Sequence, residues 1–386
     1  MRTDPNLHYL DNAATTMVDP AVADAIAAAL RESWANPSSL YDPAVLAEHK
    51  LNAARAKIAK TLNCAAREIY FTACGSESNN LAILGAALPR QAWGNKIVTT
   101  GFEHPSVQLP IRALRDRGFD VVEVAPGADG RLDVQKLIDA VDKNTVLVAC
   151  MAVNNETGAV QDIARLAAGV KAKNSRTAVH IDAVQAWLRI PRDMKKLPGV
   201  DTLAVSGHKV HAPKGIGALY LCENQRQHLR PPYLGGHQER GIRPGTENLP
   251  YAVGLGLAAE QGARRMRAAA ANAAALNAQL RAGLAALPGV TVHSPAGAVP
   301  EVLNFSTNCV NSQTFISYLN DRQIYVSGGS ACDKGEPSHT LQAMGCDARA
   351  VATALRVSFC PGNDEGDVAA LLAALKDGLA ELQHIA

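Results

Sequence analysis

Apolar and polar positions alternate along the chain with two periods, one typical of helices and one typical of strands. Helical spacing is expected at residues 20–34, 43–62, 79–88, 107–117 and 163–173. Short β-branched runs lie between or after these segments, namely EIYFT, KIVTT, DVVEV, TVLVA, TAVHI and DTLAVS. Helices that alternate with apolar strands predict a mostly parallel sheet with helices on both faces.

The pattern changes after about residue 250. A long Ala-, Leu- and Arg-rich helix is expected over residues 251–287. After it, VLNFST, YVSG and TALRVSF are predicted as strands, and residues 312–319 and 364–383 as helices. A chain of 386 residues exceeds the usual size of one domain, so two are expected. The predicted domains are a large α/β domain at 15–255 and a small α+β domain at 1–14 and 256–386.

Composition places the chain among soluble globular proteins, with 47% hydrophobic and 19% charged residues and a net charge of +2. This balance gives no electrostatic case for binding nucleic acid or an anionic membrane. The N-terminus, MRTDPNLHYLDNAATT, lacks the apolar core of a signal peptide. None of the eight cysteines has CxxC or metal-ligand spacing. We therefore expect a cytoplasmic protein without a structural metal.

Five predicted strands end close to a residue suited to ligand binding. These are Ser76 in FTACGSESNN, His104 after KIVTT, Asn155 in VNNETG, Asp182 in HIDAVQ and Lys209 in SGHKVHAPKG. Each has an ordinary alternative, because loop lysines, polar loop histidines and helix-capping aspartates are common. Ligands of open parallel sheets bind at the carboxyl ends of the strands, so five such residues favour one site.

The turn CGSES, between a predicted strand and helix, indicates an anion site, since Gly75 permits close approach and the helix start offers N–H groups. It matches neither GxxxxGK[ST] nor GxGxxG, so a single phosphate fits better than a nucleotide. Asp182 could pair with a protonated pyridine nitrogen, which pyridoxal phosphate (PLP) needs if its ring is to accept electrons.

The order of motifs along nearly the whole chain resembles the cysteine desulfurases, in the class V branch of PLP-dependent enzymes with the aspartate aminotransferase-like fold. The matching motifs are LDNAATT, NPSS, SESNNLA, EHPSV, VNNETG, HIDAVQ, SGHKVHAPKGIGALY, ERGIRPGTEN, SGGSAC and LRVSF. The lysine motif and RPGTEN are specific to this group, whereas SESNN alone is not.

The resemblance implies roles at the cofactor. Lys209 matches the lysine that carries PLP, Asp182 the partner of its ring nitrogen and Gln185 a donor to its ring hydroxyl. The phosphate ligands match Gly75, Ser76, Ser206 and His208, together with Thr246, which in the family reaches over from the second subunit of a homodimer.

The resemblance also implies substrate contacts. His104 matches a histidine that stacks on the cofactor and is a candidate proton shuttle. Asn155 and Arg356 match groups that hold the carboxylate of L-cysteine, and Asn36 is expected near the substrate.

Cys332 lies in SGGSACDKGEPSH, among small and polar residues that would not bury a thiol, so it is either incidental or a nucleophile. The resemblance implies that Cys332 accepts sulfur, giving L-alanine and a persulfide for a protein acceptor, in iron–sulfur cluster assembly or another thiolation pathway. The loop at 327–339 would carry it, with Lys334 and His339 as neighbours that could lower its pKa.

Three departures from the family pattern stand out. The loop after Cys332 is somewhat shorter than its longest form, Val184 replaces a common threonine, and Cys74-Gly75 replaces a more usual small pair. Two alternatives within PLP chemistry are a selenocysteine lyase and an ordinary class V aminotransferase, which has no need of Cys332. A third is a scaffold that binds sulfur-transfer proteins without catalysis.

Overall fold

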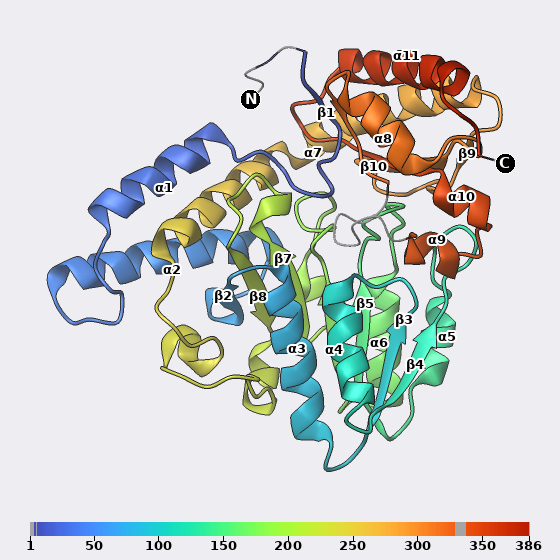
Figure 1. The fold of residues 1–386 in the computed structure, drawn as a ribbon. Coiled ribbons are helices and arrows are strands. Elements are labelled where there is room, and N and C mark those ends of the chain that lie inside the picture. Colours follow the sequence, from blue (N-terminus) through green and yellow to red (C-terminus); the bar gives the residue numbers. More distant parts are fainter. Residues whose placement is uncertain (1–3, 5, 329–336, 386) are drawn as a thin grey trace.

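The computed structural model describes residues 4, 6–328 and 337–385. A seven-stranded sheet lies at its centre, in the order β2-β8-β7-β6-β5-β3-β4 (Figure 1). Its strands are β2 (Ile69–Thr72), β3 (Lys96–Thr100), β4 (Asp120–Val124), β5 (Thr145–Met151), β6 (Ala178–Asp182), β7 (Thr202–Ser206) and β8 (Gly217–Leu221). Only β8 runs antiparallel to its neighbours β2 and β7. The predicted mostly parallel sheet is thus confirmed.

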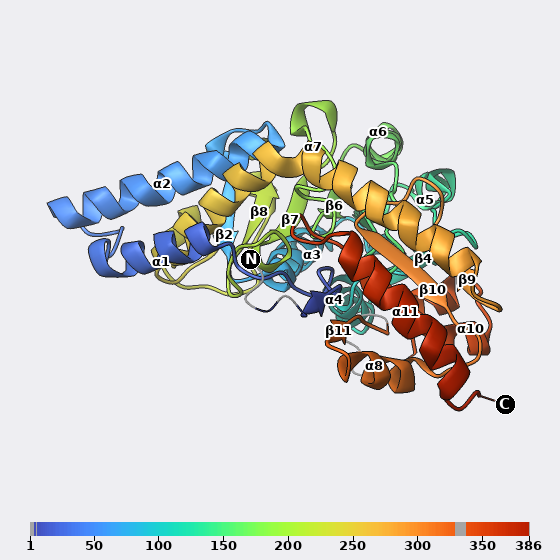
Figure 2. The same ribbon diagram turned by 90° about the horizontal axis from the view of Figure 1, so that it is seen from above.

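Helices cover both faces of the sheet, with α3 and α4 on one side and α5 and α6 on the other (Figures 1 and 2). The helices of this part are α1 (Pro20–Glu32), α2 (Asp42–Leu62), α3 (Gly75–Arg90), α4 (Pro105–Arg115), α5 (Val134–Ala140) and α6 (Ile163–Lys173). The short 3₁₀ helices are η1 (Ala66–Glu68), η2 (Met194–Lys196), η3 (Gly207–Lys209), η4 (Glu223–His228) and η5 (Gln238–Gly241).

Two predicted helix starts were too late. The N-cap of α3 is Cys74, whose Sγ accepts from the Glu77 N–H, and the N-cap of α4 is His104, whose Nδ1 accepts from the Ser106 N–H. Neither cysteine nor histidine is among the preferred cap residues, so the usual start signal is missing from the sequence. The seven-residue α5 was not predicted at all.

The 37-residue helix α7 (Leu249–Ala285) leads to the smaller part of the molecule and lies beside α11 (Figure 2). This part contains an antiparallel sheet, β12-β10-β9, and a parallel pair of β1 with β11. The strands are β1 (His8–Tyr9), β9 (Thr291–Val292), β10 (Val302–Ser306), β11 (Ile324–Tyr325) and β12 (Ala354–Ser358), and the helices are α8 (Ser312–Asn320), α9 (His339–Ala343), α10 (Ala348–Ala352) and α11 (Glu365–Glu381).

Two hydrophobic clusters meet along α7. The first packs around the large sheet and includes Leu255 and Ala259, whereas the second includes Ala273 and Leu284 together with Leu10 near the N-terminus. The exact division at residue 255 stays a prediction. Among the described residues, no helix is both long enough and apolar enough to cross a bilayer.

A buried ion pair fixes the segment that carries the RPGTEN motif. Both guanidinium Nη atoms of Arg55 on α2 donate to Glu239 in η5, at 2.6 and 2.7 Å. Glu239 also accepts from the Phe71 N–H of β2 at 2.8 Å. Such bidentate pairs set orientation as well as adding energy, so they hold the start of the segment that leads to Thr246 against the sheet.

Candidate active site

The carboxyl ends of the large sheet open into a cavity of about 730 Å³. Ten of the thirteen site residues predicted from the sequence line it: Gly75, Ser76, His104, Asn155, Asp182, Gln185, Ser206, His208, Lys209 and Arg356. They come from separate strand ends and from the small sheet, which contributes Arg356 on β12. The topology therefore brings together residues up to 281 positions apart in the sequence.

Two predicted residues, Thr246 and Asn36, do not line this cavity within one chain. Thr246 and Asn36 are both exposed to solvent outside it, and the Asn36 Oδ1 accepts from the Ser38 N–H at 2.9 Å. Cys332 and its neighbour Lys334 lie outside the described residues. The role expected of Thr246 requires a second copy of the chain, whereas Asn36 was expected near the substrate of its own chain.

Lys209 ends η3, directly after β7, and is partly buried. Its Nζ donates to the carbonyl oxygens of Ala13 and Ala14, at 2.6 and 2.7 Å. Gly207 is needed in this turn, because a Cβ there would lie 2.9 Å from a side-chain carbon of Ile216. The LDNAATT motif thus contacts the lysine turn directly.

A chain of hydrogen bonds holds the Asp182 carboxylate. Its Oδ2 accepts from Asn79 Nδ2 at 2.9 Å, and its Oδ1 accepts from the Val184 N–H at 2.9 Å. Asn79 Oδ1 in turn lies 2.9 Å from His180 Nε2. Burial lowers the pKa of His180 to about 3, so this ring is neutral and orients Asn79 without adding charge.

The same network reaches His104. Asn79 Nδ2 donates to Ser106 Oγ at 2.8 Å, and Ser106 Oγ lies 2.8 Å from His104 Nδ1. The His104 Nδ1 also accepts from the Ser106 N–H at 3.1 Å. An accepting Nδ1 places the proton of a neutral ring on Nε2. Asn79 and Ser106 were missed as site residues, although both lie inside quoted motifs, SESNN and EHPSV.

The start of α3 forms a cradle for an anion. A Cβ on Gly75 would lie 2.8 Å from Val184 Cγ2 and 3.3 Å from Ser206 Cβ, so only glycine leaves this space. The Ser206 Oγ is buried and has no hydrogen-bond partner among the described residues. Helix N-termini attract anions, and an unpaired buried hydroxyl needs an acceptor.

Arg356 is almost fully buried, with 1% of its surface exposed. Its Nη1 donates to the Asn155 carbonyl at 3.0 Å and its Nη2 to Asp11 Oδ1 at 2.8 Å, while Nε has no partner among the described residues. Its backbone forms a β-bridge with Ser327, where the predicted loop begins. Asp11 was not predicted as a neighbour of this arginine.

The far end of the predicted loop is also attached to the large sheet. Ser338 Oγ donates to the buried Glu156 carboxylate, and His339 Nε2 lies 3.0 Å from the Glu103 carbonyl oxygen. Glu156 directly follows the predicted site residue Asn155, and Glu103 directly precedes His104. The described residues on each side of positions 329–336 are therefore tied to the cavity.

Glu103 is a buried carboxyl group, and burial raises its pKa from 4.5 to about 8. Its Oε1 accepts from Thr100 Oγ1 at 2.6 Å and from the Met151 N–H at 2.8 Å, while Oε2 has no partner among the described residues. Between pH 4.5 and 8 the folded protein keeps a proton here that the unfolded chain releases. This group therefore makes the folded state less stable as pH rises through that window.

We expect the Glu103→Gln variant, which is neutral at every pH, to lose this part of the pH dependence. From pH 5 to pH 8 its free energy of unfolding should rise relative to that of the unsubstituted protein, by about 1.4 kcal/mol per pH unit at most. Urea denaturation at several pH values measures this difference, with Glu48→Gln on the exposed side of α2 as the control. Parallel pH curves for Glu103→Gln and the unsubstituted protein would contradict the assignment.

Comparisons with known proteins point to one family. Residues 8–371 match the family described as Aminotransferase class-V. The chain is 39% identical over 364 residues to a cysteine desulfurase of Nostoc sp., which covers 93% of this chain and 90% of the relative. It is 34% identical over 386 residues to the cysteine desulfurase IscS of Methanosarcina thermophila, covering 99% and 94%.

Comparisons with solved structures point to the same family. A NifS-like protein superposes with a TM-score of 0.92 at 35% identity, over 97% of this chain and 100% of the other. SspA in complex with cysteine superposes with a TM-score of 0.81 at 33% identity, over 92% and 99%.

Proposed function

The chain belongs to the Aminotransferase class-V family and is a cysteine desulfurase, and we propose that it uses PLP and leaves the sulfur of L-cysteine as a persulfide on Cys332. The observation that carries this proposal is the meeting of Lys209, Asp182 and the Gly75 cradle in one cavity. One related structure is described as a complex with cysteine, which supports L-cysteine as substrate.

The residues present fit PLP. The cradle left open at Gly75 and the unpaired Ser206 hydroxyl suit a phosphate group. Burial is the main cause that lowers the pKa of the neighbouring His208 to about 4, and the positive charge of Lys209 lowers it further. An anion bound there would offset this repulsion.

When bound, PLP supplies a ring that accepts the electrons left at Cα after its proton is removed. Lys209 would carry it, Asp182 would bind its ring nitrogen and Gln185 its ring hydroxyl. The phosphate would be held by Gly75, Ser76, Ser206 and His208, with Thr246 from a second subunit. The two hydrogen bonds that fix Asp182 keep its carboxylate oriented before any ligand arrives.

Lys209 and His104 are the residues that would move protons. The amine of Lys209 removes the Cα proton of L-cysteine, and its contacts with the Ala13 and Ala14 carbonyls fix its position beforehand. The network through Ser106 orients the His104 ring as a shuttle for a second proton.

The thiolate of Cys332 then takes the sulfur atom from L-cysteine. The C–S bond breaks, an S–S bond forms on Cys332, and the substrate carbon receives a proton to become L-alanine. One L-cysteine and one thiol thus give one L-alanine and one persulfide. A protein acceptor would receive this sulfur for iron–sulfur cluster assembly or another thiolation pathway.

A trapping experiment tests the proposal. The purified protein is incubated with L-cysteine, alkylated and digested, and mass spectrometry identifies which cysteine carries an additional 32 Da, roughly one sulfur atom. The expected result is a modified peptide with Cys332, formed together with L-alanine. Production of L-alanine with no sulfur on Cys332 would refute the persulfide.

Arg356 is expected to hold the substrate carboxylate, and its Nε is the donor without a partner among the described residues. In Arg356→Lys the planar fork is lost, so we expect KM for L-cysteine to rise about 10–100-fold with a smaller change in kcat. Steady-state kinetics measure both constants, and the cofactor absorbance of the variant serves as the control for folding. An unchanged KM would exclude this contact.

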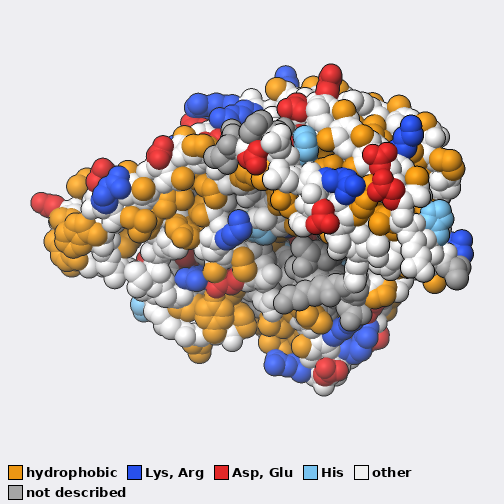
Figure 3. All heavy atoms as spheres, turned by 45° about the horizontal axis from the view of Figure 1, so that its top comes forward, with side chains coloured by type: hydrophobic (Ala, Val, Ile, Leu, Met, Phe, Trp, Pro, Cys, Tyr) orange, Lys and Arg blue, Asp and Glu red, His pale blue; other side chains and the backbone are white. Residues whose placement is uncertain are grey.

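We also propose a homodimer. The ends of α1 and α2 and the turn between them expose a set of large apolar side chains, which gather at one tip of the molecule (Figure 3): Leu30, Trp34, Leu40, Tyr41, Val45 and Leu46. Leu40 is 95% and Trp34 72% exposed. Patches of this kind mark interfaces, and a two-fold interface would bring Thr246 of one copy towards the cavity of the other.

Charges placed in this patch should separate the two copies. We expect Trp34→Asp with Leu40→Asp to elute as a monomer in size-exclusion chromatography and to bind PLP at least about tenfold more weakly, because Thr246 would no longer reach the phosphate. Glu48→Gln, exposed on α2, is the matched control. A double variant that stays dimeric would locate the interface elsewhere.

A further inference from the structure

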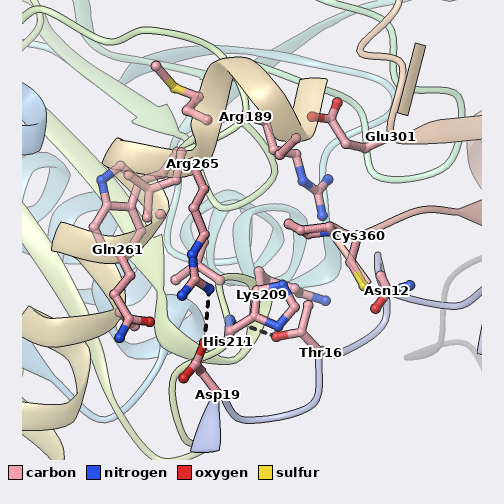
Figure 4. Close-up of a pocket in the computed structure, with 18 of the residues that line it drawn as sticks. Asn12, Thr16, Asp19, Arg189, Lys209, His211, Gln261, Arg265, Glu301 and Cys360 are labelled. Carbon is pink, nitrogen blue, oxygen red and sulfur yellow. Dashed lines mark hydrogen bonds and ion pairs between the residues drawn. The ribbon is translucent and has the colours of Figure 1, made fainter. Parts of the chain in front are cut away.

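A second cavity adjoins Lys209 but shares no other lining residue with the active-site cavity (Figure 4). It lies between α7 and the segments that follow β6, β7 and β12, and its space of about 730 Å³ is partly open to solvent. The active site described above makes no use of it.

Much of the lining of this second cavity is apolar. Trp187 and Leu188 contribute from the segment after β6, Met266 from α7 and Phe359 from the end of β12. Their side chains belong to three separate parts of the chain, so the surface exists only in the folded protein. An apolar group of the ligand would gain free energy by leaving water for this surface.

Two opposite charges lie on the same side of the cavity, Arg189 and Glu301 (Figure 4). Burial lowers the pKa of Arg189 and raises that of Glu301, and the charge of each is the largest effect opposing the shift of the other. Glu301 is only 6% exposed, and its Oε2 has no hydrogen-bond partner among the described residues. Buried carboxylate oxygens normally have a donor, so this one indicates a missing partner.

The other charged pair in the cavity is already satisfied. Arg265 on α7 makes an ion pair with Asp19 at 2.9 Å (Figure 4). The buried polar atom of this lining that has no partner among the described residues is therefore Glu301 Oε2, and Arg189 is the positive charge that acts most strongly on that carboxyl group.

We propose that this cavity is a second binding site, which takes a free α-amino acid with an apolar side chain. Its carboxylate would bind the Arg189 guanidinium, whose planar fork suits carboxylates. Its ammonium group would donate to Glu301, and its side chain would lie against Trp187 and Met266. A zwitterion with an apolar side chain matches all three features of the cavity.

A ligand bound in this second site would change contacts in the active site. Arg189 Nη1 also donates to Gln185 Oε1, and Gln185 Nε2 donates to the Ala13 carbonyl at 2.9 Å. Gln185 lines the active-site cavity, and Ala13 accepts from Lys209. A ligand that draws Arg189 towards its carboxylate therefore acts on the residues around Lys209, without touching the substrate.

Calorimetry tests the proposal. L-leucine is titrated into the PLP-loaded enzyme after borohydride treatment, which fixes the cofactor to Lys209 so that no amino acid can replace the lysine. We expect one L-leucine per chain, with binding at least tenfold weaker in Glu301→Gln, which loses the charge, and in Met266→Trp, which fills the cavity. Arg267→Gln, exposed on the same helix, should bind L-leucine as the unsubstituted protein does.

Two ligand analogues separate the charges. N-acetyl-L-leucine lacks the ammonium group and L-leucinol lacks the carboxylate, and each is expected to bind at least tenfold more weakly than L-leucine. Equal binding of either analogue, no binding of L-leucine, or unchanged L-leucine binding in both Glu301→Gln and Met266→Trp would overturn the proposal.

Discussion

Replacement of Lys209 with alanine should lower the rate of L-alanine formation from L-cysteine by at least about 10³-fold, because the variant loses both the cofactor-bearing amine and the base for the Cα proton. Lys209 lines the active-site cavity at the carboxyl end of the sheet, and its Nζ donates to the Ala13 and Ala14 carbonyls. No other lysine lines the active-site cavity among the described residues.

The matched control is Lys214→Ala. This lysine lies five positions later in the same motif but is exposed, outside the cavity. The yellow absorbance of the purified protein and its loss on borohydride treatment are measured for both variants, together with L-alanine yield. Borohydride-sensitive absorbance that survives in Lys209→Ala and disappears in Lys214→Ala would reverse the assignment.

Cys332→Ala should lower the rate of L-cysteine desulfuration by at least about 10²-fold, because the enzyme then lacks the nucleophile that receives sulfur. L-alanine and sulfide are measured with and without an external thiol. Cofactor absorbance should stay unchanged, which separates loss of the acceptor from loss of folding. Full activity of Cys332→Ala would show that Cys332 is not the residue that receives sulfur.

Cys74 is the competing candidate, because its side chain belongs to the active-site cavity. Cys309 is partly exposed in the small part of the molecule and serves as the control. If Cys74→Ala loses the persulfide while Cys332→Ala retains it, sulfur is accepted at the start of α3. If Cys332→Ala alone loses it, the loop residue is the acceptor.

Much of the sheet could be predicted because strand periodicity is a local property of the sequence. The sequence also predicted that one site would contain Ser76, His104, Asn155, Asp182 and Lys209, because parallel strands place their carboxyl ends at one edge of a sheet. The starts of α3 and α4 could not be predicted, because their N-caps are a cysteine and a histidine rather than the usual capping residues.

The hydrogen-bond network was beyond sequence reasoning. Asn79 and Asp182 are 103 positions apart, and nothing local shows that Asn79 faces the carboxylate rather than solvent. The same holds for Arg356, whose partner Asp11 lies 345 positions away. Thr246 illustrates a different limit, because its predicted role requires a second subunit, which one chain does not contain.

The pairing of β1 with β11 has a consequence for synthesis of the protein. His8 pairs with Ile324, and Leu10 belongs to the hydrophobic cluster of the small part. His8 leaves the ribosome long before its partner Ile324, which lies 316 positions later in the sequence. The large sheet can complete itself earlier, since its last strand ends at Leu221. The first strand must therefore stay unpaired until most of the chain has emerged, and this long-range closure is expected to be a late step of folding.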